Sequence, residues 1–213
     1  MTSEPTHEAF LGAPRRAHRG RTFVYVLRCQ GQDLLKVGFS HDPIMRFHTL
    51  HRRFYAFFDL DESFLIETDR LQEGRRLERL FIERWPEHQA PAPLSISSAA
   101  GGHTEWFRGV GDSVLAIAER LAERYGHSMH APLRPWLRAQ MMDRADLLYA
   151  WSDRLYQIIE WQTANQPDGA QDCRYSRMLC DALNAMESVG IKCKGLVPGP
   201  VHRWYLANRT WPP

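Results

Sequence analysis

Long hydrophobic runs are missing from this sequence. No apolar stretch approaches the roughly 20 residues that a membrane-spanning helix needs. The N-terminus, MTSEPTHEAF, also lacks the apolar core of a secretory signal peptide. These absences argue against a membrane partner and predict a soluble protein that stays in the cytoplasm.

Cysteine is scarce, at four residues, and no two of them form a C-x-x-C pair. Their spacing excludes a disulfide-stapled scaffold and fits a reducing compartment. One alternative is a zinc site made of Cys173, Cys180, Cys193 and His202. Buried or idle thiols are the preferred interpretation, because the spacing of a zinc knuckle is absent.

An excess of charge of one sign is also missing, since the formal net charge is only +2. With 44% apolar and 24% charged residues, the composition excludes a disordered chain. The early cations are Arg15, Arg16, Arg19, Arg21, Arg28, Lys36, Arg46, Arg52 and Arg53. A locally basic half fits a polyanion such as DNA, and Arg28, Arg52 and Arg53 are candidate phosphate contacts. On charge alone, a solvated surface is the simpler interpretation.

The length of 213 residues leaves room for two modest domains. We expect a flexible basic arm over residues 1–20, where proline and glycine lie among charges without periodicity. A first domain is expected over residues 21–110. A mainly helical accessory domain is expected over residues 111–213.

The first domain begins with the pattern of a β-hairpin. Residues 22–28 and 34–39 are rich in β-branched and aromatic side chains and flank a turn-like Gln-Gly-Gln-Asp. A helix should follow, capped by Ser40 or Asp42 with Pro43 in its first turn. Two short β-like runs, residues 54–60 and 64–67, precede a second helix that ends at Pro86. We expect Thr68 or Asp69 to cap that helix.

The accessory domain shows helical patterns over residues 112–125, 137–163 and 176–189, and we expect a short β-hairpin over residues 191–207. Its longest helix carries an apolar stripe: Leu148, Trp151, Leu155 and Ile158. Near-heptad spacing of this kind is more often a seam inside a bundle than a dimer seam. Homo-oligomer formation through this domain is therefore the minority interpretation.

Four side chains of the first domain combine into a chemical pattern. Tyr25 lies in the first predicted strand and Lys36 in the second, while Arg46 and Glu78 lie on the two helices that follow. A tight hairpin can bring Tyr25 and Lys36 together, and a helix that leaves the second strand can direct Arg46 to the same place. We expect the four to converge on one cleft that solvent reaches and that suits a phosphodiester.

These residues resemble the motifs of the GIY-YIG nuclease superfamily, in a phage-related branch whose second motif reads KIG. Phe23–Tyr25 is similar to the GIY element and Lys36–Gly38 to the second element. Ser40–Arg46 matches S-x-D-P-x-x-R, Leu77–Glu78 matches an L-E helix, and Glu105–Phe107 matches a closing E-W-F. The resemblance covers about half of the chain, and its specificity lies in the order of five short pieces.

The resemblance implies an α+β domain with a small three-stranded antiparallel sheet flanked by helices. It also implies a DNA endonuclease that uses one divalent metal ion, Mg²⁺ or Mn²⁺, held by Glu78. Arg46 would bind a phosphate oxygen, and Tyr25 would accept or relay the proton of the attacking water. Lys36 would help by lowering the pKa of that phenol.

The sequence departs from the family pattern in ways that leave a second function open. Phe23 replaces the first glycine, Lys36 replaces the second tyrosine, and Ile82 stands where a histidine often follows the glutamate. The alternative is a nucleic-acid-binding or assembly module that has lost catalysis. Glu73 and Glu105 compete with Glu78 for a place in the site.

The C-terminal part shows a second, shorter resemblance. Leu183–Leu206, with the element Pro198–Val201 before Tyr205, is similar to the helix-strand-strand segment that precedes the motor of FtsK-type DNA translocases. The matched segment includes no catalytic residue. An unrelated strand pair with a proline turn is the competing interpretation.

Overall fold

The computed structural model describes residues 20–96, 100–165 and 174–209. It forms two compact units, of which the first ends at Trp136 and the second begins at Leu137. Helix α6 (Leu133–Met142) spans this boundary. Apart from Gly20, the expected flexible arm lies outside the described residues, as does Cys173.

The first unit is built on one antiparallel sheet of five strands in the order β4-β2-β1-β3-β5. The strands are β1 (Thr22–Cys29), β2 (Leu35–Ser40), β3 (Phe58–Thr68), β4 (Trp106–Phe107) and β5 (Ser128–His130). The α+β class is confirmed, but the expected three-stranded sheet is corrected to five strands. The two additional strands are short edge strands that pair with residues far away in sequence, so no local pattern marks them.

The hairpin of β1 and β2 is confirmed and sets the register of the candidate site. Tyr25 lies opposite Gly38, and Leu27 lies opposite Lys36. The turn closes with a hydrogen bond from the Cys29 backbone N–H to the Leu34 carbonyl oxygen at 2.8 Å.

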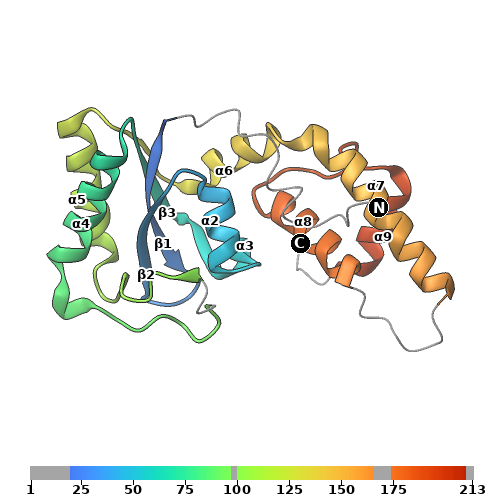
Figure 1. The fold of residues 1–213 in the computed structure, drawn as a ribbon, viewed down its shortest axis with the longest axis horizontal. Helices are drawn as coiled ribbons and strands as arrows, with labels where there is room; N and C mark the ends of the chain where they lie inside the picture. The colour runs from blue at the N-terminus through green and yellow to red at the C-terminus, as the bar shows by residue number, and fades with distance from the viewer. Residues whose placement is uncertain (1–19, 97–99, 166–173, 210–213) are drawn as a thin grey trace. The chain divides into compact units, whose positions relative to one another are not determined.

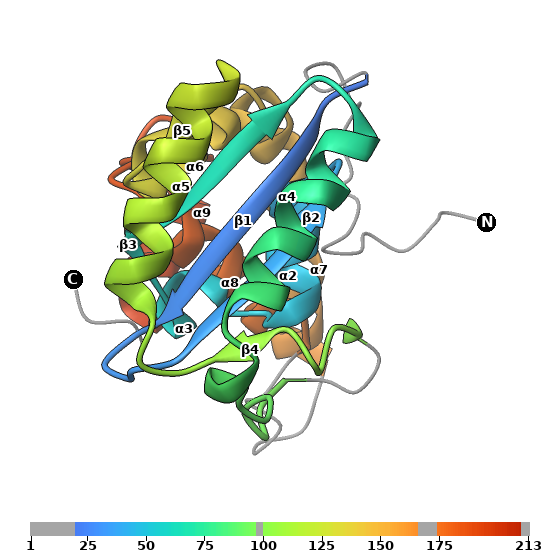
Figure 2. The same ribbon diagram turned by 90° about the vertical axis from the view of Figure 1, so that its left-hand side faces the viewer.

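Helices cover both faces of the sheet (Figures 1 and 2). On one face lie α4 (Leu71–Arg84) and α5 (Gly111–Tyr125), and on the other lie α2 (Pro43–Leu50) and α3 (Phe54–Phe57). The core under α4 and α5 contains Val24, Val26, Val37, Leu77, Phe81, Val114 and Ala118. Because α5 buries its apolar face in this core, the boundary expected near Val110 lies inside the first unit.

The expected helix over residues 43–50 is confirmed. The Asp42 carboxylate accepts a hydrogen bond from the Met45 backbone N–H at 3.2 Å, and Pro43 occupies the first turn. An N-cap of this type removes one of the unpaired N–H groups at a helix start. It therefore fixes where α2 begins and which way Arg46, one turn further on, can point.

The two expected β-like runs are confirmed in part. Residues 54–57 form the short helix α3, whereas residues 58–60 and 64–67 are strand but belong to one element, β3, whose pairing with β1 shifts register between them. The expected cap of the next helix is wrong. Neither Thr68 nor Asp69 caps α4, which follows Arg70 without a side-chain cap. The Thr68 hydroxyl instead donates to the Thr22 carbonyl oxygen at 3.1 Å, so it links the neighbouring strands β3 and β1. As expected, α4 ends before Pro86, which opens the 3₁₀ turn η1 (Pro86–His88).

The second unit is helical, with α7 (Ala145–Asn165), α8 (Arg174–Ser188) and α9 (Gly199–Asn208). The expected helix over residues 137–163 is interrupted between α6 and α7. Leu148, Trp151 and Leu155 are buried, and α7 packs against both α8 and α9, as a seam inside a bundle requires. None of the helices in the described part of the chain combines the length and apolar character needed to cross a bilayer.

The expected β-hairpin over residues 191–207 is wrong. The described residues there contain one isolated bridge, between Lys194 and Val197, followed by helix α9. Proline in the first turn suits a helix start, because the N–H it lacks has no partner there. Val201 and Tyr205, four residues apart, then share one buried helical face. The segment similar to FtsK-type translocases therefore has a helix where two strands were expected.

Candidate functional site

Tyr25 and Arg46 meet at the second half of β2. The Arg46 Nε–H donates to the Tyr25 hydroxyl oxygen at 3.0 Å. Tyr25 is fully buried, with its ring edge against Phe47 of α2 at a centroid distance of 5.3 Å. Its hydroxyl lies over Gly38, where a Cβ atom would approach the oxygen to 2.4 Å. The glycine of the second motif thus leaves room for the tyrosine of the first.

Lys36 lies in the same sheet and is fully buried. Its ammonium donates to the Val37 carbonyl oxygen at 2.8 Å and forms an ion pair with the Glu105 carboxylate. The Trp106 ring centroid lies 5.9 Å from the Nζ atom. Burial lowers the pKa of Lys36, and the hydrogen bond and charge of Glu105 oppose that change. Lys36, the second cation of the site, is therefore paired with Glu105, which directly precedes β4.

Glu78 contributes a half-buried carboxyl group from α4. Its pKa is raised to about 7, first by burial and then by the negative charge of Glu105, while Lys36 and Arg46 oppose this. One charge shifts the pKa of another group only over a short distance, so we group Glu78 with Lys36, Arg46 and Glu105. Glu73, five residues earlier on α4, projects about 140° away around the helix axis.

The structure changes the role expected for Lys36. Burial raises the pKa of Tyr25 to about 12, and Arg46 is the cation that opposes this rise. A phenol with this pKa stays protonated at neutral pH. The expectation that Lys36 lowers the pKa of Tyr25 is therefore replaced by a contact in which Arg46 binds the neutral phenol.

The residues of the candidate site differ in their exposure to solvent. Tyr25 and Lys36 are fully buried, whereas Arg46, Glu78 and Glu105 are half-buried. We call these five residues the charge cluster. An Arg46 guanidinium N–H also donates to the Ala100 carbonyl oxygen.

Glu78 is the residue of the cluster that could hold a divalent cation, whose other ligands would be oxygens from outside the cluster. Glu78 supplies one carboxylate, and its raised pKa marks a site where a nearby cation would favour the charged form. Among the residues that the structure describes, no group of three or more His, Cys, Asp or Glu side chains is arranged to hold a metal ion. Mg²⁺ commonly binds to one or two carboxylates and keeps waters or substrate phosphates as its other ligands.

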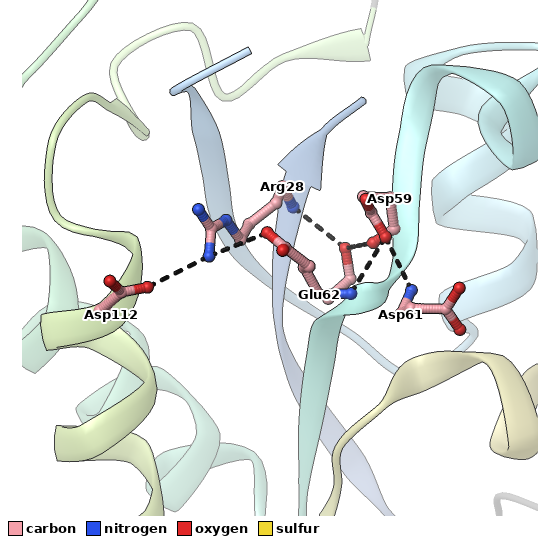
Figure 3. A network of polar contacts seen from close by, with 6 residues as sticks. Arg28, Asp59, Asp61, Glu62 and Asp112 are labelled. Carbon is pink, nitrogen blue, oxygen red and sulfur yellow. Dashed lines mark hydrogen bonds and ion pairs between the residues drawn. The ribbon is translucent and has the colours of Figure 1, made fainter. Parts of the chain in front are cut away.

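Arg28, expected to contact phosphate, belongs to a different network (Figure 3). Its guanidinium pairs with Glu62 of β3 at 3.0 Å and with Asp112 of α5 at 3.4 Å. Its backbone N–H donates to the Ser63 hydroxyl at 3.0 Å, at the bulge where β3 shifts register. Two neighbouring carboxylates compensate the charge of Arg28, which weakens its attraction for a phosphate.

The other two cations expected to contact substrate are Arg52 and Arg53. They lie together on the exposed segment between α2 and α3, within the same unit as the charge cluster.

Sequence reasoning had Glu105 only as a competitor and missed Ala100 and Gly102. A Cβ atom on Gly102 would lie 2.7 Å from Lys36 Nζ and 2.6 Å from Glu105 Oε2, so this glycine packs on the ion pair. The sequence did contain a signal for this turn, the pair Gly101–Gly102 shortly before the E-W-F motif. A glycine pair often marks backbone with positive φ, and both residues adopt positive φ in the structure.

Comparisons of this chain with protein-family models, with curated proteins and with solved structures found no match.

Proposed function

We propose that the first unit hydrolyses phosphodiester bonds of DNA with the help of Mg²⁺ or Mn²⁺. The observation that carries this proposal is that Arg46 binds the Tyr25 phenol, Lys36 pairs with Glu105, and the charges of both cations act on Glu78. Such a site can bind a phosphate, hold a cation and move a proton, which are the three requirements of the reaction. The resemblance to the GIY-YIG motifs points to the same chemistry.

Arg46 and Tyr25 act on the phosphate and the water in this proposal. Arg46 donates to a phosphate oxygen and offsets the charge that accumulates as water attacks phosphorus. One P–O bond forms to the water oxygen while the bond to the leaving sugar oxygen breaks. Tyr25, a neutral phenol bound to Arg46, is fully buried in the free protein, so it can orient the water and relay its proton only after Arg46 moves to the phosphate and exposes the hydroxyl.

Glu78 is the residue that would hold the metal ion. When bound, a divalent cation acts as a Lewis acid on the phosphate and stabilises the leaving oxygen. The charges of Lys36 and Arg46 act on the Glu78 carboxyl group, which supports a place for Glu78 in the same site.

A second candidate function is a nucleic-acid-binding module without catalysis. It is favoured by the fact that both cations of the cluster already have acceptors inside the protein. Lys36 pairs with Glu105, and Arg46 donates to Ala100. A site whose cations are already paired must exchange these contacts for a phosphate before it can react.

The decisive experiment compares cleavage with binding in matched variants. Supercoiled plasmid, single-stranded DNA and RNA are incubated with wild type, Glu78→Gln and Glu73→Gln in Mg²⁺, Mn²⁺ or EDTA. Glu78→Gln should lose cleavage by about 10²-fold or more but bind DNA in EDTA like wild type, because it loses only the metal ligand. Glu73→Gln is the control, since it removes a carboxylate from the same helix on a different face.

Arg46→Ala should lose both cleavage and DNA affinity, because it removes a direct phosphate contact. Wild type that binds DNA but cuts no substrate with either metal would reject hydrolysis in favour of the binding module. Cleavage that persists in Glu78→Gln would retain the enzyme and reject this metal ligand.

A further inference from the structure

The ammonium of Lys36 occupies an unusual environment for a positive charge. It is fully buried, and beside the Trp106 ring it contacts one carbonyl oxygen, of Val37 at 2.8 Å, and one carboxylate, of Glu105. A carbonyl group offers only a partial negative charge. A buried ammonium without a full counter-charge tends to lose its proton. The charge of Lys36 therefore depends on Glu105.

The backbone holds Glu105 in this position. The Val37 N–H donates to the Glu105 carbonyl oxygen at 3.0 Å, and the next residue, Trp106, pairs with Lys36 in the ladder of β4 and β2. Gly102 closes the other side of the ion pair, with no room for a side chain. Glu105 is thus fixed by the sheet edge and by the turn before it, so its carboxylate has little freedom to leave Lys36.

We propose that Glu105 is a positioning residue that keeps the buried Lys36 protonated and fixes its ammonium within the charge cluster, so that a cation is in place when a phosphate takes over its contact with Glu105. The charged groups that act on Lys36 are Glu105, Arg46 and Glu78, and Tyr25 lies on the neighbouring strand β1. Lys36 stands where a second tyrosine is expected. Because Glu105 keeps Lys36 protonated, this residue acts as a cation and not as a base. This role rests on the proposed phosphodiester hydrolysis for its purpose, but the charge of Lys36 is measurable without it.

The chain is well suited to a direct measurement because it contains only three lysines: Lys36, Lys192 and Lys194. Protein labelled with ¹³C at the lysine ε carbon gives three signals, and Lys36→Met identifies the signal of Lys36. Lys192 and Lys194 are exposed in the other unit and serve as internal references. The titration is recorded in EDTA without DNA for wild type, Glu105→Gln and Glu105→Asp.

In wild type, Lys36 should keep the signal of an ammonium through neutral pH. In Glu105→Gln it should become neutral at a lower pH, because burial remains while the counter-charge is gone. Glu105→Asp restores the charge and should recover much of the wild-type behaviour. Identical titration of Lys36 in wild type and Glu105→Gln would overturn the proposal.

A matched pair of glycine variants tests the same contact without changing a charge. Gly101 and Gly102 have φ of 65° and 67°, so alanine strains the backbone similarly at both. Only at position 102 does the added Cβ meet Lys36 and Glu105, whereas at position 101 nothing lies within 4 Å. Gly102→Ala should move the Lys36 signal and Gly101→Ala should not. Equal effects of the two variants on that signal would contradict the inferred geometry.

Cleavage kinetics connect this charge to function. Lys36→Met and Glu105→Gln should each lower kcat by about 10²-fold, and the double variant should be no worse than either, because Glu105 acts through Lys36. Fully additive losses would overturn the positioning role. If wild type cuts no substrate, the proposed hydrolysis fails by itself, and the lysine titration alone then decides whether Glu105 sets the charge of Lys36.

Discussion

The contact between Gly38 and Tyr25 predicts the effect of a single added methyl group. In Gly38→Ala the new Cβ would lie 2.4 Å from the Tyr25 hydroxyl oxygen and 2.6 Å from its Cζ atom. Atoms cannot approach this closely, so the ring must move. Tyr25 is fully buried between Gly38 and Phe47, and its hydroxyl accepts the hydrogen bond from Arg46, so every available movement disturbs another contact.

The cost of this substitution can be worked out from these contacts. Overpacking in a dense core costs about 1 to 3 kcal/mol, and loss of the Arg46 hydrogen bond adds about 1 kcal/mol. Gly38→Ala should therefore lower the free energy of unfolding by about 2 to 4 kcal/mol. It should also weaken DNA cleavage, because the relative positions of Tyr25 and Arg46 change.

Urea unfolding of Gly38→Ala and Tyr25→Phe, compared with wild type, separates these contributions. Tyr25→Phe removes only the hydroxyl, so it should cost about 1 kcal/mol, less than Gly38→Ala. Gly31→Ala in the turn between β1 and β2 measures backbone strain alone, because its φ is 65° and the added Cβ meets nothing within 4 Å. A Gly38→Ala protein with wild-type stability and activity would show that Tyr25 does not lie over Gly38 as described.

The remaining predictions concern charge. Lys36→Met should cost less stability than Glu105→Gln in urea unfolding at neutral pH, because the group left behind is a partly exposed carboxylate in the first case and a fully buried ammonium in the second. The pKa of Glu78 rises from 4.5 to about 7 on folding, so the folded state binds more protons between these values, and stability should fall as pH rises through this window. Glu78→Gln should remove that slope, and an unchanged slope would assign it to another group. In DNA binding, Arg52→Ala should reduce the slope of log affinity against log salt by about 0.9. Arg28→Ala should leave the slope unchanged, because Glu62 and Asp112 already compensate that charge; an equal reduction in both variants would contradict this pairing.

Local signals were sufficient for the elements that carry Tyr25 and Arg46. Alternating β-branched and aromatic residues around a short turn predict the hairpin, because a strand exposes its two faces in alternation. Asp42 and Pro43 predict the start of α2, because they satisfy or avoid unpaired N–H groups there. The sequence by itself therefore determined a hairpin followed by a helix, with Arg46 within reach of Tyr25.

Similar local signals misled where two structures could satisfy them. Pro198 and Pro200 interrupt a strand, but they also suit the first turn of a helix. Burial of Val201 and Tyr205 on one face decided in favour of α9, and this burial depends on packing against α7 and α8, which no pattern within residues 191–207 shows.

Only the tertiary structure decided which charges compensate one another. The pairing of β4 with β2 brings Glu105 to Lys36, and the approach of α5 to β1 brings Asp112 to Arg28. Tertiary packing also buries Tyr25, whose ring contacts Phe47 of α2, and this burial raises the pKa of Tyr25, although the sequence suggested a lowered pKa. The physical reason is that charge interactions and desolvation depend on distance through space, and residues 69 or 84 positions apart in the chain carry no local record of that distance.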